Sequence, residues 1–174
     1  MKSINEAKDY FYNLHDVECN QKYSDNLPYS FHLDLVAKQA DLFKKYIPVD
    51  DPYYSAVWIG VYGHDSIEDA RVSYNQIKDM FGELSAEIIY LCTEYKGRNR
   101  AERKPDLFYY ELNENNLAVF VKLCDIIANT KFSLLTNSTM FGKYKSEYKN
   151  KVRPILYTEE YKDMFTYLDK LYEF

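Results

Sequence analysis

The stretch GHDSIEDA, residues 63–70, places a histidine and three carboxylates at the end of a strongly apolar segment. His64 and Asp65 are adjacent, and Glu68 and Asp69 follow three and four residues after Asp65. Burial of an uncompensated carboxylate costs roughly several kcal/mol, so charges at such a position require a cation or hydrogen bonds. A bound metal ion is the simplest compensation.

A second apolar segment, NLAVFVKLCDIIANTK (residues 116–131), carries Asp125 and Asn129 four residues apart. In a helix these two side chains share a face. Two apolar helices are expected to pack together, and His32, near the start of another predicted helix, can supply a second imidazole. The four side chains His32, His64, Asp65 and Asp125 suit a divalent ion with open positions, manganese best and zinc or iron as alternatives.

Such an ion lowers the pKa of bound water and polarises a phosphoryl oxygen, which favours phosphate-ester hydrolysis. An isolated His-Asp dipeptide arises by chance in many proteins. Here the dipeptide ends one apolar helix, and Asp125 lies inside another, between FVKLC and IIAN. A solvated network of surface ion pairs does not explain an aspartate in that setting, so the metal site is the favoured interpretation.

The elements that must position these residues are predicted to be helices, because apolar residues recur at helical spacing and only 5 Gly and 5 Pro interrupt the chain. Capping boxes at Ser3–Glu6 and Ser73–Gln76 mark two helix starts. If the apolar helix persists past His64, Glu68 lies above His64 and Asp69 above Asp65. The predicted all-α bundle has helices at 3–15, 29–46, 52–65, 73–81, 83–95, 116–131, 140–152 and 159–171, with a charged loop at 96–105.

Length and composition favour one domain, residues 1–174, with a full hydrophobic core. The formal net charge of −5 disfavours binding to nucleic acid or to an anionic membrane. No apolar run approaches the roughly 20 residues of a transmembrane helix, and the charged N-terminus does not resemble a secretory signal. A cytoplasmic location is therefore expected, and the composition is typical of an AT-rich bacterial or phage genome, so the cytoplasm could be that of a phage host. The oligomeric state stays open.

The motifs resemble those of HD-domain phosphohydrolases, and most closely those of small stand-alone hydrolases that remove the 3'-pyrophosphate from the alarmones ppGpp and pppGpp. The resemblance rests on PYSFH ending at His32, on GHDSIEDA, and on VKLCDIIANT, which is similar to the V-K-L-A-D-x-x-x-N element of that family. It implies an HD-domain helical bundle, a bound Mn²⁺ and a guanosine tetra- or pentaphosphate substrate.

Carried over by position, the resemblance makes His32, His64, Asp65 and Asp125 the metal ligands. Glu68 and Asp69 match the acidic pair that positions or deprotonates the attacking water. Three further positions match residues that contact the substrate: Lys22, Asn129 and Tyr148. The chain departs from many members at Ile126, where a basic residue usually follows the metal-binding aspartate.

This departure leaves two alternatives open. One is a nucleotidase-like HD enzyme that acts on nucleoside monophosphates or a nucleotide cofactor. The other is a non-catalytic helical nucleotide-binding module, which would not need Glu68 and Asp69. The run KGRNRAERK has two interpretations with about equal weight: a solvated face, or a phosphate clamp that uses Arg100 or Arg103. His15 is expected at a helix end without a ligand role.

Overall fold

A computed structural model describes residues 2–24 and 26–173 of the chain, which form a bundle of helices. Two very short strands, β1 (Lys22–Tyr23) and β2 (Leu27–Pro28), pair antiparallel with Lys22 opposite Pro28. The all-α prediction is confirmed. The helices are α1 (Ile4–Tyr12), α2 (Ser30–Leu42), α3 (Tyr54–Gly63), α4 (Ser66–Asp69), α5 (Tyr74–Phe81), α6 (Glu83–Cys92), α7 (Arg100–Arg103), α8 (Asp106–Leu112), α9 (Asn116–Leu135), α10 (Met140–Glu147), α11 (Arg153–Leu156) and α12 (Lys162–Tyr172). Two π-helical segments cover Asn13–Glu18 and Tyr148–Val152, and two 3-10 turns cover Lys44–Tyr46 and Glu159–Tyr161.

The helix starts follow the capping signals of the sequence. The Ser3 side chain accepts a hydrogen bond from the Glu6 backbone, and the Glu6 carboxylate accepts one from the Ser3 backbone. Ser73 and Gln76 form the same reciprocal pair at the start of α5. Both predicted capping boxes are confirmed, and each satisfies backbone donors that a helix start otherwise leaves unpaired.

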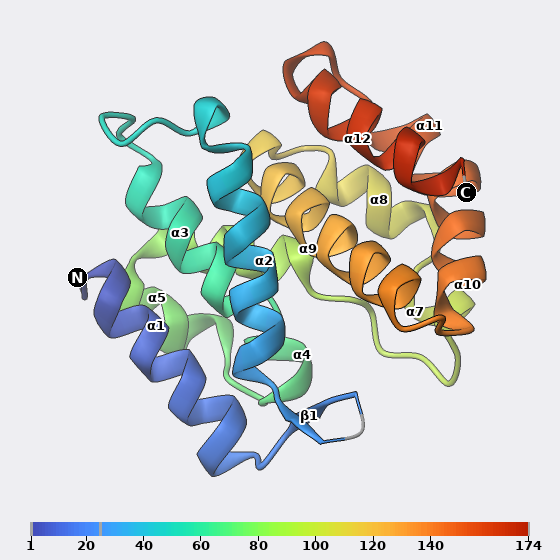
Figure 1. Cartoon of the computed structure of the whole chain (residues 1–174). Helices are drawn as coiled ribbons and strands as arrows, with labels where there is room; N and C mark the ends of the chain where they lie inside the picture. The colour runs from blue at the N-terminus through green and yellow to red at the C-terminus, as the bar shows by residue number, and fades with distance from the viewer. Residues whose placement is uncertain (1, 25, 174) are drawn as a thin grey trace.

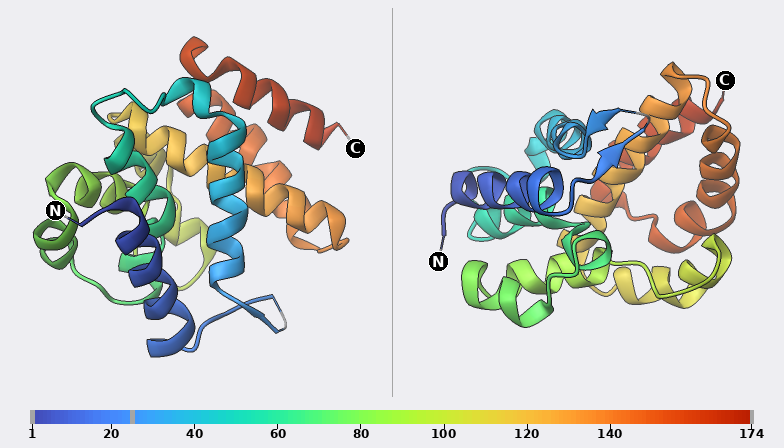
Figure 2. Two further views of the ribbon diagram at one scale, coloured as in Figure 1. Left: turned by 60° about the vertical axis from the view of Figure 1, so that its left-hand side comes forward. Right: turned by 90° about the horizontal axis from the view of Figure 1, so that it is seen from below.

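Helix α9 lies at the centre of the bundle and organises the other helices (Figure 1). It packs against α2, α3 and α6 on one side and against α10 and α12 on the other. Most of its residues are buried, including the polar residues Lys122 and Asp125. Figure 2 shows the same arrangement from two further directions, with α1 and α3 adjacent and the C-terminal helices on the opposite side of α9. The apolar character of α3 and α9 therefore results from their contacts with several neighbours at once.

Several boundaries differ from the prediction. Helix α3 ends at Gly63, residues 64 and 65 form a turn, and α4 begins at Ser66, so the condition for Glu68 to lie above His64 in one helix is not met. The Asp69 backbone N–H still donates to the Asp65 carbonyl at 2.9 Å, the helical spacing expected for that pair. The N-terminal helix continues as a π-helical segment to Glu18, because its last turn widens. Helix α9 continues to Leu135. Helix α7 lies within the predicted charged loop, and α8 lies in a segment for which no element was predicted.

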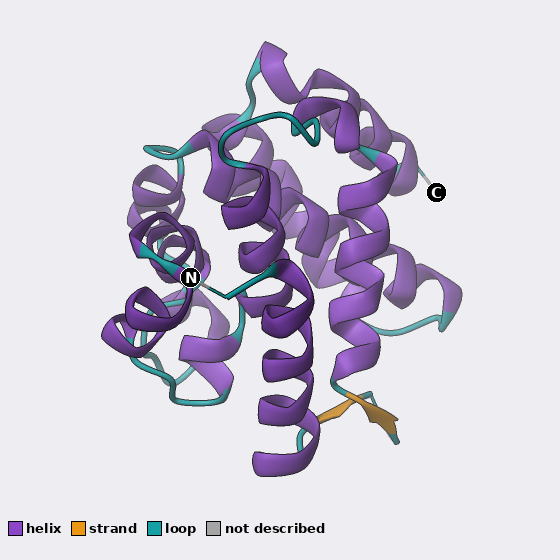
Figure 3. Cartoon of the chain, turned by 90° about the vertical axis from the view of Figure 1, so that its left-hand side faces the viewer, coloured by secondary structure: helices purple, strands orange, loops and turns teal. Residues whose placement is uncertain are grey.

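The β1–β2 hairpin lies between the N-terminal helix and α2, in a segment where no helix was predicted, and it leads into the start of α2 (Figure 3). Among the described residues, no helix has both the length and the apolar composition that a membrane crossing requires.

Helices α1, α3 and α6 approach closely at Gly63. A Cβ atom there would lie 2.5 Å from Cζ of Phe11 and 2.6 Å from Cδ1 of Ile89. We expect Gly63→Ala to lower the free energy of unfolding by about 1–3 kcal/mol, the usual cost of overpacking a core. Urea denaturation followed by circular dichroism measures this change.

Gly142→Ala in the exposed helix α10 is the matched control, because a Cβ there meets no atom within 4 Å. It should raise stability by up to about 1 kcal/mol, through helix propensity alone. Equal effects of the two substitutions would contradict the close packing at Gly63.

Candidate metal centre

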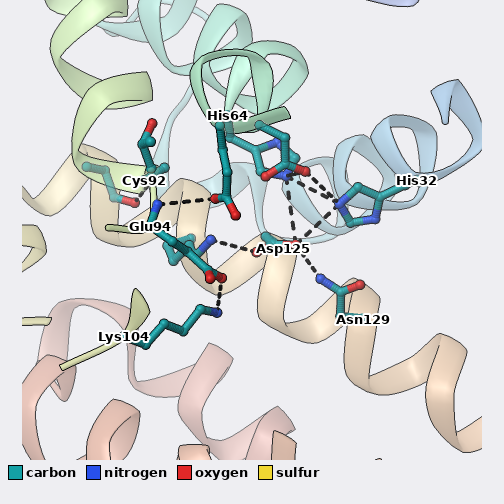
Figure 4. A network of polar contacts seen from close by, with 12 residues as sticks. His32, His64, Cys92, Glu94, Lys104, Asp125 and Asn129 are labelled. Carbon is teal, nitrogen blue, oxygen red and sulfur yellow. Dashed lines mark hydrogen bonds and ion pairs between the residues drawn. The ribbon is translucent and has the colours of Figure 1, made fainter. Parts of the chain in front are cut away.

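Three helices bring His32, His64 and Asp125 to one buried point. His32 lies in the first turns of α2, His64 follows the end of α3, and Asp125 lies in the middle of α9. One ligand atom from each, the imidazole nitrogens and a carboxylate oxygen, lies within 4.8 Å of the other two. Figure 4 shows the three side chains directed toward one another. Segments far apart in the sequence thus converge as the residue types alone predicted.

Asp65 completes this group. Its Oδ2 atom lies 2.9 Å from Nε2 of His64 and 3.4 Å from Nε2 of His32. The Oδ1 atom of Asp125 lies 3.3 Å from Nε2 of His32 and 3.8 Å from Nε2 of His64. The sequence predicts all four side chains as ligands, and the fold brings the four close together. We refer to His32, His64, Asp65 and Asp125 as the metal-site cluster.

The donor atoms of this cluster fit a divalent cation. Nδ1 of His64 lies 3.0 Å from the Val61 carbonyl, so it carries the proton and leaves the lone pair of Nε2 directed at the cluster. The two Nε2 atoms lie 3.3 Å apart, each beside carboxylate oxygens. Two imidazole nitrogens and two carboxylates at such short separations are a ligand set for Mn²⁺, Zn²⁺ or Fe²⁺, and they select none of these alone.

The electrostatics of the cluster favour ionised carboxylates. Burial opposes ionisation of Asp65 and Asp125. The His64 and His32 imidazoles nevertheless hold the pKa of Asp65 well below its usual range, and Lys122 together with the same imidazoles does so for Asp125. Burial alone would lower the pKa of His32, whereas the carboxylates of Asp125 and Asp65 raise it to about 9. The site therefore attracts positive charge, as a proton on His32 or as a cation that replaces this proton.

A buried lysine orients Asp125. Nζ of Lys122 lies 3.0 Å from Oδ2 of Asp125, one helical turn away on α9, and only 3% of Lys122 is exposed. Oδ1 of Asp125, the atom that faces the imidazoles, also accepts a hydrogen bond from the Asn129 amide. Tyr23 of the hairpin donates to Oδ1 of Asn129 at 3.0 Å and stacks on the His32 ring. Each oxygen of Asp125 thus has a fixed partner, which holds the carboxylate in one orientation.

A second network holds Asp65 and Asp69. The Tyr29 hydroxyl lies 2.6 Å from Oδ2 of Asp65 and 3.1 Å from Oδ2 of Asp69. The Gln21 amide donates to the same oxygen of Asp69 at 2.8 Å. His15 is fully buried, stacks on the Tyr29 ring and bonds to Gln21, so it supports the site from behind without joining the cluster. Asp69 is therefore positioned as an acceptor beside the metal-site cluster.

Glu68 has a different environment. Its Oε2 atom accepts a hydrogen bond from the Glu94 backbone at 3.2 Å. Desolvation and the nearby Glu94 carboxylate raise the pKa of Glu68 to about 7. Burial opposes ionisation of Glu94, but Nζ of Lys104 lies 2.6 Å from Oε1 of Glu94 and helps to hold the pKa of Glu94 below its usual range. Glu94 therefore stays ionised. A carboxyl that titrates near neutrality beside a ligand cluster is suited to proton transfer.

The predicted substrate residues lie at different positions around the cluster. Asn129, Tyr148 and Arg100 line one small cavity that includes Asp125. Arg100 pairs with Glu147 there, and the Tyr148 hydroxyl donates a hydrogen bond to Asp169 at 2.6 Å. Arg103 pairs with Glu94 instead. Lys22 is exposed on the hairpin, next to Tyr23, and makes no ion pair with any other residue that the structure describes.

The sequence did not identify Tyr23, Tyr29, Glu94 or Lys122 as parts of the site. Lys122 had a detectable signal, because it lies three residues before Asp125 on the same helical face. Tyr29 had a comparable signal, because it lies three residues before His32 within the PYSFH motif. Tyr23 and Glu94 reach the site only through tertiary contacts and carry no spacing signal.

The sequence matches no family model and no curated protein significantly. In structure, the chain is similar to a metazoan ortholog of SpoT, a protein described as hydrolysing ppGpp and playing a role in starvation responses. The TM-score is 0.76 at 20% sequence identity, over 98% of this chain and 93% of that one. The chain therefore shares the fold of that protein.

The geometry predicts that residues that hold a metal can be separated from residues that use it. Asp65→Asn removes a charged side chain from the predicted ligand set. We expect metal affinity to fall by more than the ~10–100-fold typical of residues that only hydrogen-bond to the ligands, so that metal content after purification collapses. Glu68→Gln should retain one divalent ion per chain, because Glu68 lies outside the cluster. Elemental analysis of both variants, with circular dichroism to show that they are folded, measures this difference. Loss of metal from Glu68→Gln as well would make Glu68 a ligand.

Proposed function

We propose that the protein is a metal-dependent hydrolase that removes the 3'-pyrophosphate from ppGpp or pppGpp, with Mn²⁺ as the expected ion. The observation that carries this proposal is the metal-site cluster with Glu68 and Asp69 beside it. The fold shared with a protein described as hydrolysing ppGpp supports the same substrate class. When bound at His32, His64, Asp65 and Asp125, a divalent ion would lower the pKa of a water and polarise a phosphoryl oxygen.

The residues of the chain supply the proton transfers. Hydrolysis forms a bond from a water oxygen to phosphorus, breaks the bond from phosphorus to the ribose 3'-oxygen, and leaves a proton on that oxygen. Glu68, whose pKa is about 7, is suited to take the proton of the water and to return it. Asp69, fixed by Tyr29 and Gln21, accepts a second hydrogen bond from the water and orients it.

The cavity beside Asp125 is where we place the nucleotide. Asn129 of α9 and Tyr148 of the π-helical segment after α10 line it, and Arg100 adds a cation for phosphate oxygens. Lys22 and Arg103 are proposed as further phosphate contacts, from the hairpin and from α7. The Arg103 ion pair with Glu94 would have to open for this contact.

One observation favours a second candidate function. Ile126 lines the same cavity as Asn129, so an apolar side chain lies where many alarmone hydrolases have a basic residue. The cavity therefore carries less positive charge, which fits an HD nucleotidase that acts on nucleoside monophosphates or on a nucleotide cofactor. A non-catalytic binding module is disfavoured, because a binder does not need a carboxyl of raised pKa next to the metal ligands.

Product analysis tests the proposal. The purified protein with Mn²⁺ should convert ppGpp to GDP and pyrophosphate, resolved by ion-exchange chromatography. Release of orthophosphate alone, or turnover of nucleoside monophosphates in preference to ppGpp, would favour the nucleotidase. Binding of ppGpp without any product would favour the binding module.

The pH dependence tests the role of Glu68. As a base, Glu68 must be ionised, so kcat/KM should rise about tenfold per pH unit below pH 7 and level off above it. Glu94→Gln removes a neighbouring negative charge, which favours ionised Glu68, so the midpoint should move to lower pH. Rate profiles from pH 5 to 9 measure this shift.

Glu87→Gln is the control, since Glu87 lies on the same segment of the chain but bonds to Tyr74. It should leave the midpoint unchanged. A midpoint that does not move in Glu94→Gln would contradict the coupling between Glu94 and Glu68.

A further inference from the structure

Positive charge is concentrated in two segments of this acidic chain. Residues 96–104 and 143–153 together hold ten of the 22 Lys and Arg residues but only two of the 27 Asp and Glu residues. The formal net charge of the whole chain is −5, so the remaining residues are strongly acidic. An uneven distribution of this kind attracts anions to one part of the surface.

The fold brings these two segments together around one pocket. Helix α7 forms one wall, and α10 with the π-helical segment Tyr148–Val152 forms the other; α7 and α10 lie close together in Figure 1. Glu147 is the one acidic residue among the described lining residues. The remaining polar side chains of the lining are cationic or neutral: Arg100, Lys104, Lys143, Ser146, Asn150 and Lys151.

The charges in the pocket are only partly neutralised. Arg100 and Lys104 both pair with Glu147, and Lys104 also pairs with Glu94. Lys151 donates to the Lys104 carbonyl and lies 3.2 Å from Asp106. Lys143 is exposed and makes no ion pair with other described residues. Four cations face one lining carboxylate, with a hydroxyl and an amide between them, which is a suitable environment for phosphate oxygens.

The pocket adjoins the metal centre. Arg100, Lys104 and Glu147 line both this pocket and the small cavity that contains Asp125 and Asn129. Lys104 is only 7% exposed, so a buried ammonium lies in the wall between the two spaces. A ligand that reaches from one space to the other would need negative charge at both ends.

We propose that this pocket binds the 5'-phosphate groups of the nucleotide whose 3'-phosphates lie at the metal centre. The inference rests on the proposed function, and it assigns recognition of the 5'-end to Lys143, Ser146 and Asn150. The pocket then selects nucleotides with a 5'-polyphosphate over those that lack one.

Charge reversal at Lys143 tests this assignment. Lys143→Glu should raise KM for ppGpp about 5- to 10-fold and leave kcat within about twofold, because the lost interaction is the same in ground and transition states. For guanosine 3'-diphosphate without 5'-phosphates, KM should stay unchanged. Steady-state kinetics with both substrates and Mn²⁺ measure the difference.

Lys145→Glu is the matched control. Lys145 is an exposed lysine on the same helix, but it lines a different pocket with Lys149 and Arg153. The same change of net charge there should leave KM for ppGpp nearly unchanged. Equal effects of the two variants, or an equal effect of Lys143→Glu on both substrates, would overturn the proposal.

A binding measurement separates this proposal from the proposed function. Calorimetry with inorganic tripolyphosphate, in the presence of a chelator that removes free metal, measures binding to the pocket alone. The wild-type protein and Lys145→Glu should both bind tripolyphosphate, and Lys143→Glu should bind it at least about fivefold more weakly. If the protein hydrolyses no alarmone but this pattern holds, the proposed function fails and the anion pocket stands. Binding that is absent from the wild type, or equal in all three proteins, would overturn the pocket.

Discussion

The structure depends on the burial of two imidazoles and two carboxylates where α2, α3 and α9 meet. Four ionisable groups in one desolvated place are unfavourable unless a cation compensates the carboxylates. The fold surrounds the cluster with groups that fix it: the Val61 carbonyl holds His64, Lys122 holds Asp125, and Tyr29 holds Asp65. Central helix α9 contributes Asp125, Lys122 and Asn129 on one face, which explains why an otherwise apolar helix contains these polar residues.

Two separate networks surround the cluster, one around Asp69 and one around Glu68. On one side, Tyr29 and Gln21 hold Asp69 as an acceptor, and His15 stacks behind them. On the other, burial and the Glu94 carboxylate raise the pKa of Glu68, while Lys104 and Arg103 keep Glu94 ionised. Two adjacent acids of the same motif therefore have different properties because their neighbours differ.

Much of this arrangement could be predicted from local pattern. Capping boxes set the starts of α1 and α5, and the spacing of Asp125 and Asn129 placed both on one face of α9. The types of His32, His64, Asp65 and Asp125 indicated a shared metal site before any fold was known. The turn at residues 64–65 could not be predicted in the same way, because the sequence continues to show helical spacing there. Glu94 and Tyr23 join the site through contacts between distant segments, and His15 is buried by a π-helical turn that has no clear sequence signal.

The central claim is that the cluster holds a catalytic divalent ion. Anomalous diffraction from crystals grown with Mn²⁺ tests it most directly, because the signal locates the ion without reference to activity. The account predicts one strong peak within coordination distance of His32 Nε2, His64 Nε2 and the carboxylates of Asp65 and Asp125. A peak at other residues, or no peak in crystals of a protein that is active with Mn²⁺, would contradict it.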